Sequence, residues 1–252
     1  MSPDQYLRNI LARERVETGL LSPVRNVATT LAPMLRNWGG RYLLAIEPSG
    51  SFAKGTGNRV GTDIDLLLSL SSSTPDSLAQ IRKTLGNCLR QHGYNFREQN
   101  VSLGITVGGY QVDLVPGKRQ SQYGGDHSLY RRKANTWTKT NIQTHVSRVR
   151  DSGRTEEIRV LKLWRDQKGL DFPSIYLELA TLQALHGRPL GQLAGNVVHA
   201  LKFFGNNLTT IRVIGPANTN NVISDDLSAP GKQAVASAAK RALSGKWSGI
   251  VT

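Results

Sequence analysis

Several features that mark other classes of protein are absent from this sequence or scarce in it. Its 252 residues include one cysteine, Cys88, which excludes an internal disulfide and any zinc site built from several cysteines. No run of about eighteen apolar residues is present, so we expect no membrane-spanning helix. The charged N-terminal segment has no apolar signal-peptide core. Together these absences predict a soluble protein of a reducing, cytoplasmic compartment.

Acidic residues are also scarce. The chain has 18 Asp and Glu against 32 Lys and Arg, a formal net charge of +14. Such an excess favours polyanionic partners such as nucleic acid or nucleotides. Three readings of the charge stay open: a nucleic-acid surface for an activator or acceptor strand, a field that steers NTPs, and a generally basic soluble surface.

The pattern of apolar residues divides the chain into two parts. The first half alternates helices over 7–11, 24–35 and 76–93 with strands over 41–47, 63–70 and 100–117, the last range holding two strands that meet at Gly108-Gly109. From Thr155 on, helical spacing dominates, over 156–169, 174–187, 190–205 and 229–243, with 211–228 as an ordered loop. We therefore expect a mixed α/β lobe and a helical lobe, with a ligand cleft between them.

Two aspartates, Asp63 and Asp65, stand one residue apart at the start of an apolar strand pattern. In a strand these two carboxylates share one face, while the apolar residues between and after them share the other. Like charges held so close repel each other, and burial increases the cost. A divalent cation is the obvious compensation.

A third acid and a glycine-rich turn strengthen this reading. Asp113 lies in the apolar pattern "YQVDLVP", and three carboxylates on neighbouring strands suit oxygen ligation of Mg²⁺. The preceding turn "SGSFAKGTGNRVGTD" contains Gly50, Ser51 and three further glycines, Gly55, Gly57 and Gly61. Backbone N–H groups and hydroxyls in such a turn can cradle phosphate oxygens. A flexible connection and solvated strand-end aspartates are the plain alternatives.

These residues resemble the signature of the DNA polymerase β-type nucleotidyltransferases: a Gly-Ser turn, a spaced Asp-x-Asp and a third acid downstream. Within that superfamily the chain most resembles the cGAS/DncV-like nucleotidyltransferases (CD-NTases) of bacterial antiphage defence. Oligoadenylate synthases and archaeal-type CCA-adding enzymes are wider relatives. The segments "GTDIDLLLSL", "VDLVPGKRQ", "GDHSLYRRKANTWTKTN" and "IRVLKLWRDQKGLDFPSIYLEL" carry the resemblance over most of residues 45–225.

The resemblance implies an α+β, bilobal, polymerase β-like fold with the active site in the cleft. Residues 1–40 would form N-terminal helices bracing the lobes, 41–125 the catalytic core and 126–252 the helical domain. Asp63, Asp65 and Asp113 would hold two Mg²⁺ ions, with Mn²⁺ as an alternative, and Asp113 would help deprotonate the attacking hydroxyl.

The resemblance also assigns residues that hold the nucleotide. Gly50 and Ser51 would contact the donor triphosphate, and Lys162 and Ser174 would grip it from the helical lobe. Relatives often carry an aromatic residue for base stacking where this chain has Ile175, so we assign stacking to the next residue, Tyr176. Relatives often have Asp-Pro where this chain has Gly215-Pro216, which leaves the role of that loop open.

Two basic segments lie outside this set. In "SLYRRKANTWTKTN" basic residues alternate with Tyr130 and Trp137, an arrangement that suits phosphate contact with stacking. A solvated basic loop with Trp137 packed in the core is the equal alternative. We expect the second run to face solvent: Arg148, Arg150, Arg154 and Arg159. The scattered histidines lack the spacing of a zinc site.

The function that follows from the resemblance is metal-dependent joining of NTPs into a cyclic or short linear oligonucleotide second messenger. Pyrophosphate would be released, and a downstream effector would sense the product rather than this chain. The expected setting is antiviral defence, without membrane attachment. Nucleotide addition to an RNA 3′ end and a catalytically silent nucleotide- or RNA-binding module remain as alternatives.

Overall fold

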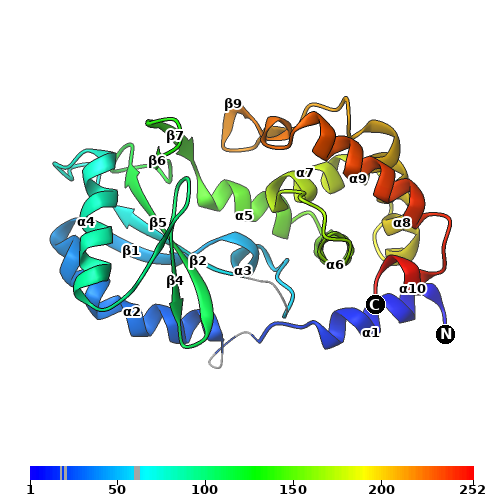
Figure 1. Ribbon diagram of the computed structural model, residues 1–252, viewed down its shortest axis with the longest axis horizontal. Helices are drawn as coiled ribbons and strands as arrows, with labels where there is room; N and C mark the ends of the chain where they lie inside the picture. The colour runs from blue at the N-terminus through cyan, green and yellow to red at the C-terminus, as the bar shows by residue number, and fades with distance from the viewer. Residues whose placement is uncertain (18, 20–21, 60–62) are drawn as a thin grey trace. The chain divides into compact units, whose positions relative to one another are not determined.

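The computed structural model describes residues 1–17, 19, 22–59 and 63–252 (Figure 1). Gly61, one of the glycines of the turn expected to bind phosphate, lies outside the described residues. The backbone contacts divide the chain into two compact units. The α/β unit comprises Val16–Lys54 and Thr62–Val146, and the helical unit comprises Met1–Arg15, Gly55–Gly61 and Ser147–Thr252.

A seven-stranded mixed sheet organises the α/β unit. Its strand order is β1-β2-β5-β4-β3, with β6 paired to β5 and β7 paired to β6. The central pair β2 and β5 is parallel, and the other pairs are antiparallel. The strands are β1 (Leu43–Pro48), β2 (Ile64–Leu70), β3 (Arg97–Glu98), β4 (Leu103–Val107), β5 (Tyr110–Arg119), β6 (His127–Arg131) and β7 (Thr136–Thr140).

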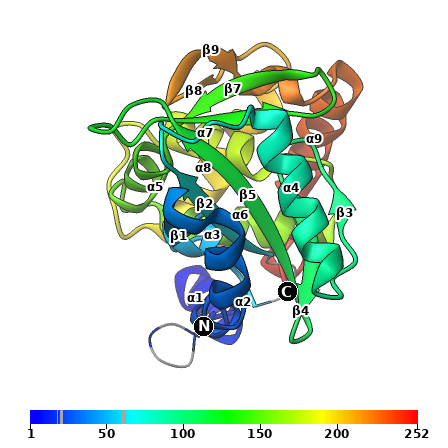
Figure 2. The same ribbon diagram turned by 90° about the vertical axis from the view of Figure 1, so that its left-hand side faces the viewer.

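Two helices cover one face of this sheet, as Figure 2 shows for α2 (Pro23–Gly39) and α4 (Leu78–Gln91). Apolar side chains of both helices form one core with alternate residues of β2, Ile64, Leu66 and Leu68. A capping box at Ser77 starts α4, because Ser77 and Gln80 satisfy each other's backbone N–H groups. Two shorter elements complete the α/β unit: η2 (Gly40–Tyr42) and α3 (Gly50–Lys54). The helix α5 (Ile142–Arg150) begins in this unit, and its residues from Ser147 on belong to the helical unit.

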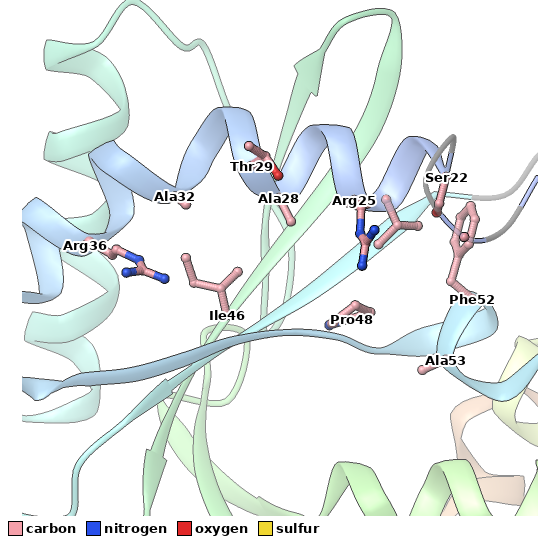
Figure 3. A pocket seen from close by; sticks show the side chains of 12 residues that line it. Ser22, Arg25, Ala28, Thr29, Ala32, Arg36, Ile46, Pro48, Phe52 and Ala53 are labelled. Atoms are coloured by element: carbon pink, nitrogen blue, oxygen red, sulfur yellow. The ribbon is translucent and has the colours of Figure 1, made fainter.

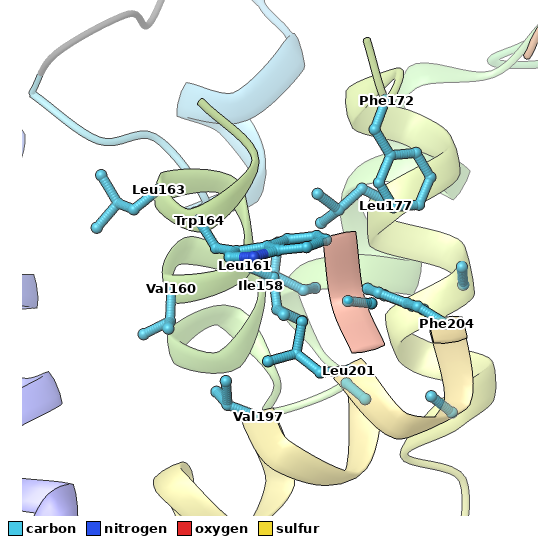
Figure 4. Packing of buried hydrophobic residues seen from close by; sticks show 14 of the residues in the cluster. Ile158, Val160, Leu161, Leu163, Trp164, Phe172, Leu177, Val197, Leu201 and Phe204 are labelled. Atoms are coloured by element: carbon cyan, nitrogen blue, oxygen red, sulfur yellow. The ribbon is translucent and has the colours of Figure 1, made fainter. Parts of the chain in front are cut away.

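The helical unit is built around a separate apolar core (Figure 4). Its largest fully buried groups are Trp164, Tyr176, Phe172 and Phe204. The rings of Phe172 and Phe204 meet edge to face with centroids 5.6 Å apart. Its helices are α1 (Pro3–Arg13), α6 (Thr155–Gln167), α7 (Ser174–Ala184), α8 (Leu193–Asn207), α9 (Ala229–Ala242) and α10 (Trp247–Ile250). The hairpin β8 (Ile214–Gly215) and β9 (Asn218–Val222) and the turn η3 (Ile223–Asp226) lie between α8 and α9.

The predicted α+β fold, with a mixed sheet and a helical part, is confirmed. Two loops of the sequence interpretation are instead partly strands. Segment 127–140 forms the β6–β7 hairpin, in which Tyr130 pairs with Trp137, and segment 211–228 contains β8, β9 and η3. Trp137 is 55% exposed, so it does not pack in a core. No helix in the described part of the chain is long and apolar enough to cross a membrane.

Candidate functional site

The parallel pairing of β2 with β5 brings two of the predicted acids side by side. Asp65 of β2 and Asp113 of β5 are register partners in adjacent strands. Asp63 lies two residues before Asp65, one residue outside β2. The flanking residues Ile64 and Leu66 are fully buried against the covering helices. The apolar face fixes the register, and the register places the carboxylates on the opposite face.

Gly50 is required by the position of the Asp65 side chain. Its φ of +58° lies in the left-handed region, and a Cβ added there would stand 1.7 Å from Asp65 Oδ2. The neighbouring Ser49 N–H donates to the Asp65 carbonyl oxygen at 2.8 Å. Only glycine combines this backbone conformation with such close approach. The Gly50-Ser51 turn is thus held against the second acid, with Ser51 half-buried in α3.

Asp113 has partners that the sequence interpretation missed. Gln99 Nε2 donates to Asp113 Oδ1 at 2.7 Å, and Ser102 Oγ donates to Gln99 Oε1 at 3.0 Å. Burial of the carboxyl, and then the negative charge of Asp63, raise the pKa of Asp113. No sequence motif marks Gln99 or Ser102, because strand pairing alone brings them to Asp113.

The donor set has the chemistry of a magnesium site. Three carboxylates, the half-buried Asp65 and Asp113 and the exposed Asp63, supply the hard oxygen ligands that Mg²⁺ prefers. Burial is the first cause of the raised pKa of Asp113 and the charge of Asp63 is the second, and a bound cation would offset that charge. Within the described ranges, no three or more His, Cys, Asp or Glu side chains are gathered closely enough to form a metal site. Metal binding by these residues therefore stays a prediction.

Lys162, predicted to grip a triphosphate, is buried in the helical unit beside two partners. Its Nζ lies 2.7 Å from Glu178 Oε1 and 2.9 Å from Thr56 Oγ1. Thr56 Oγ1 in turn donates to the same carboxylate oxygen at 3.0 Å. All three residues are at most 4% exposed. These residues belong to three separate segments of the sequence, "AKGT", "LKLW" and "YLEL". The sequence interpretation did not predict that they meet.

A second polar network anchors the same chain segment at Asn58, between α3 and the first acid. Arg159 Nε donates to Asn58 Oδ1 at 3.1 Å, and Asn58 Nδ2 donates back to the Arg159 carbonyl oxygen at 3.1 Å. Arg159 Nη2 also donates to the Leu11 carbonyl oxygen at 2.9 Å. The expectation that Arg154 and Arg159 face solvent is wrong, because Arg159 is half-buried and the buried Arg154 pairs with Glu157 at 3.2 Å.

Ser174 and Tyr176 differ sharply in exposure although both belong to α7. Ser174 is exposed at the first position of the helix, where its hydroxyl accepts a hydrogen bond from Arg165 Nη1 at 2.8 Å. Tyr176 is fully buried, and its hydroxyl donates to the Leu208 carbonyl oxygen at 3.2 Å. Burial raises the pKa of Tyr176 to about 12. The ring therefore has no face open to a nucleobase, and Tyr176 is not part of the proposed site.

The eight predicted residues are thus distributed over both units. The α/β unit holds Gly50, Ser51, Asp63, Asp65 and Asp113, and the helical unit holds Lys162, Ser174 and Tyr176. Strand pairing brings Asp65 and Asp113 together, and the tight contact at Gly50 holds the Gly50-Ser51 turn against Asp65. Arg165, which contacts Ser174, is a further residue that the sequence interpretation missed.

Comparison with solved structures finds the same fold in several nucleotide-bound proteins. CdnC of E. coli MS115-1 with ATP superposes with a TM-score of 0.75 at 20% identity, covering 96% of this chain and 90% of that one. The CD-NTase CdnG of Bradyrhizobium diazoefficiens with GTP gives 0.80 at 13% identity, covering 96% and 91%. The CdnE cyclic dinucleotide synthase of Elizabethkingia meningoseptica, with GTP and Apcpp, gives 0.70 at 14% identity, covering 97% and 100%.

At these levels of identity the similarity is one of fold. No protein-family model matches the chain. No curated protein sequence matches it either. The chain therefore has the nucleotidyltransferase fold of solved CD-NTases, as the resemblance implies, and covers nearly their whole length.

Proposed function

We propose that this protein is a metal-dependent nucleotidyltransferase that joins NTPs into a cyclic or short linear oligonucleotide. The observation that carries the proposal is the pairing of Asp65 with Asp113 beside the Gly50-Ser51 turn. Support comes from the fold, which is shared with proteins solved with ATP or GTP. A role as a cytoplasmic second-messenger synthase in antiphage defence follows from the resemblance.

In the reaction a nucleotide hydroxyl attacks the α-phosphorus of an NTP. A new P–O bond forms, the bond to the pyrophosphate breaks, and the hydroxyl proton leaves. Asp113 is suited to take that proton, because a carboxylate with a raised pKa is the stronger base. The Ser51 hydroxyl and the backbone N–H groups of the turn would hold the triphosphate. Ser174, and Lys162 if released from Glu178, would add phosphate contacts.

Asp63, Asp65 and Asp113 would hold two Mg²⁺ ions, or Mn²⁺ in their place. When bound, such ions neutralise phosphate charge and lower the pKa of a coordinated hydroxyl. The strand register would orient Asp65 and Asp113 for this task, and the hydrogen bond from Gln99 would hold the Asp113 carboxylate. In the absence of a cation, the same arrangement leaves the charge of Asp63 acting on Asp113.

The test is synthesis by the purified full chain. All four radiolabelled NTPs are supplied with Mg²⁺ or Mn²⁺, with and without added RNA or DNA, and products are resolved after phosphatase treatment. We expect a phosphatase-resistant labelled product that is lost in Asp63→Ala. Label that enters only added RNA would instead indicate 3′-end addition. Nucleotide binding without any product or pyrophosphate would indicate a silent binding module.

A further inference from the structure

A groove in the α/β unit lies away from the acidic face, between α2, the edge strand β1 and α3 (Figure 3). Its volume is about 540 Å³, within the range of sites for small molecules. Ile46 and Phe52, which line it, also pack against the core beneath α2. The groove therefore opens on the helix-covered side of the sheet, and Asp65 and Asp113 lie on the other side.

One stripe of α2 forms a wall of this groove. Arg25, Ala28, Thr29, Ala32 and Arg36 recur at helical spacing along it. The two small alanines leave space between the arginines, whose backbone positions are about 16 Å apart at 1.5 Å rise per residue. In Figure 3 both guanidinium groups point from α2 toward β1.

Both arginines are available to a ligand. They are exposed, and neither guanidinium has a hydrogen-bond or ion-pair partner among the residues that the structure describes. No acidic residue lines the groove, so its walls carry two uncompensated positive charges. Guanidinium groups match phosphate oxygens in paired hydrogen bonds, which makes arginine well suited to phosphate recognition.

The rest of the lining suits a planar apolar group. Phe52 and Pro48 lie near Arg25 at one end of the groove, with Ile46 nearer to Arg36 (Figure 3). Aromatic and apolar surfaces of this kind stack on nucleobases without strong preference among them. A ligand that fits the groove would therefore have a planar ring and, at some distance from that ring, a negative charge.

We propose that this groove binds a nucleotide, at a site separate from the acidic face. Its phosphates would contact one arginine, and its base would lie against Phe52 and Pro48. Phe52 and Ala53 belong to α3, the short helix that also contains Gly50 and Ser51. A nucleotide bound in the groove therefore contacts α3, the helix that carries the predicted phosphate-binding turn, and biases the position of Ser51. This coupling rests on the proposed function, whereas binding itself does not.

The test measures binding of the fluorescent nucleotide mant-ATP to the full chain by anisotropy, in EDTA so that metal-dependent binding at the aspartates is absent. We expect the double variant Arg25→Glu/Arg36→Glu to bind at least about tenfold more weakly, a loss of about 1.4 kcal/mol. The matched control is Lys83→Glu, an exposed cation on α4 of the same unit, which should bind as the unaltered chain does.

A second variant removes the groove without changing charge. Ala32→Trp fills the space between the arginines, and we expect it to abolish mant-ATP binding while the melting temperature stays within a few degrees. Three results would each overturn the proposal. Lys83→Glu could weaken binding as much as the double variant does, or Ala32→Trp could bind mant-ATP undiminished. The third is no mant-ATP binding by the unaltered chain up to about 1 mM. Displacement of the probe by poly-glutamate but not by ATP would also overturn it. Binding in EDTA remains measurable even if the chain makes no product, so the two proposals fail separately.

Discussion

Two polar clusters in this protein differ in how their charges are compensated. In the helical unit, Lys162 and Glu178 form a fully buried ion pair completed by the Thr56 hydroxyl. In the α/β unit, Asp65 and Asp113 are register partners on adjacent strands, and Asp63 lies just before β2. Burial, and then the charge of Asp63, raise the pKa of Asp113. The first cluster is neutral as a whole, and the second carries net negative charge.

The difference indicates different roles. A compensated, hydrogen-bonded ion pair stabilises the arrangement that contains it, here the attachment of Thr56 to α6 and α7. Uncompensated carboxylates lower the stability of the fold and are kept where a ligand relieves them. We therefore infer that the aspartates are the candidate site for chemistry, whereas Lys162 forms a structural ion pair in the helical unit. The following predictions test this difference between the two clusters.

The largest expected effect is on catalysis. Asp65→Asn removes one metal-ligating charge while keeping the shape of the side chain, and we expect product formation to fall by at least about a thousandfold. The melting temperature should not fall, because the change reduces repulsion in the acidic cluster. Radiolabelled product formation and thermal unfolding of the same preparation check both parts. A variant that retains full activity would remove Asp65 from the site.

The next effect is on stability. Glu178→Ala leaves the Lys162 ammonium buried without its carboxylate, and we expect a loss of about 3–5 kcal/mol. Replacing both partners, as in Lys162→Met/Glu178→Met, should restore most of it, since no charge is then buried. Thermal unfolding checks this order. Asp151→Ala, which removes the exposed pair with Arg150, is the matched control and should cost less than about 1 kcal/mol.

A smaller effect is expected at the glycine turn. Gly50→Ala adds left-handed strain and drives a Cβ into Asp65 Oδ2, so we expect about 1–3 kcal/mol lost from catalysis, seen as about 5- to 150-fold slower product formation. Gly108→Ala is matched, because its φ is +56° and a Cβ there meets nothing within 4 Å. It should lose some stability and keep its activity. Equal activity losses in both variants would point to backbone strain alone.

The smallest effect is a pH dependence of stability without metal. Because the pKa of Asp113 is raised in the folded protein, its contribution to stability is full below the unfolded pKa and is lost as pH rises through the folded value. Asp113→Asn should therefore melt higher than the unaltered chain at neutral pH, by a few degrees, and the gain should vanish in acid. Thermal unfolding in EDTA across pH measures the difference.

Asp126 should contribute a pH dependence of stability that is opposite to that of Asp113. Hydrogen bonds from Asn141, and then from Lys139, lower the pKa of its carboxyl. Its contribution is therefore present above the unfolded pKa and is lost as pH falls through the folded value. Asp126→Asn should be slightly less stable at neutral pH and indistinguishable in acid. A gain at neutral pH in both asparagine variants would show that general charge reduction, rather than the acidic cluster, is being measured.

The sequence by itself determined the α+β fold class and the candidate acids. Apolar periodicity marked β2 and the long helices, because each must bury one face, and Asp63, Asp65 and Asp113 stood out as charges inside such patterns. Gly50 stood out because a turn before a strand favours glycine. Local pattern was sufficient wherever neighbours in the chain impose the constraint.

Only the tertiary structure decided which polar residues meet. Gln99 reaches Asp113 through strand pairing, and Thr56, Lys162 and Glu178 meet across separations of up to 122 residues. The burial of Tyr176, two positions beyond the exposed Ser174 in α7, likewise depends on what packs against the helix. Contacts between distant segments arise from packing and register, which no local pattern encodes, and the groove lined by Arg25 and Arg36 exists for the same reason.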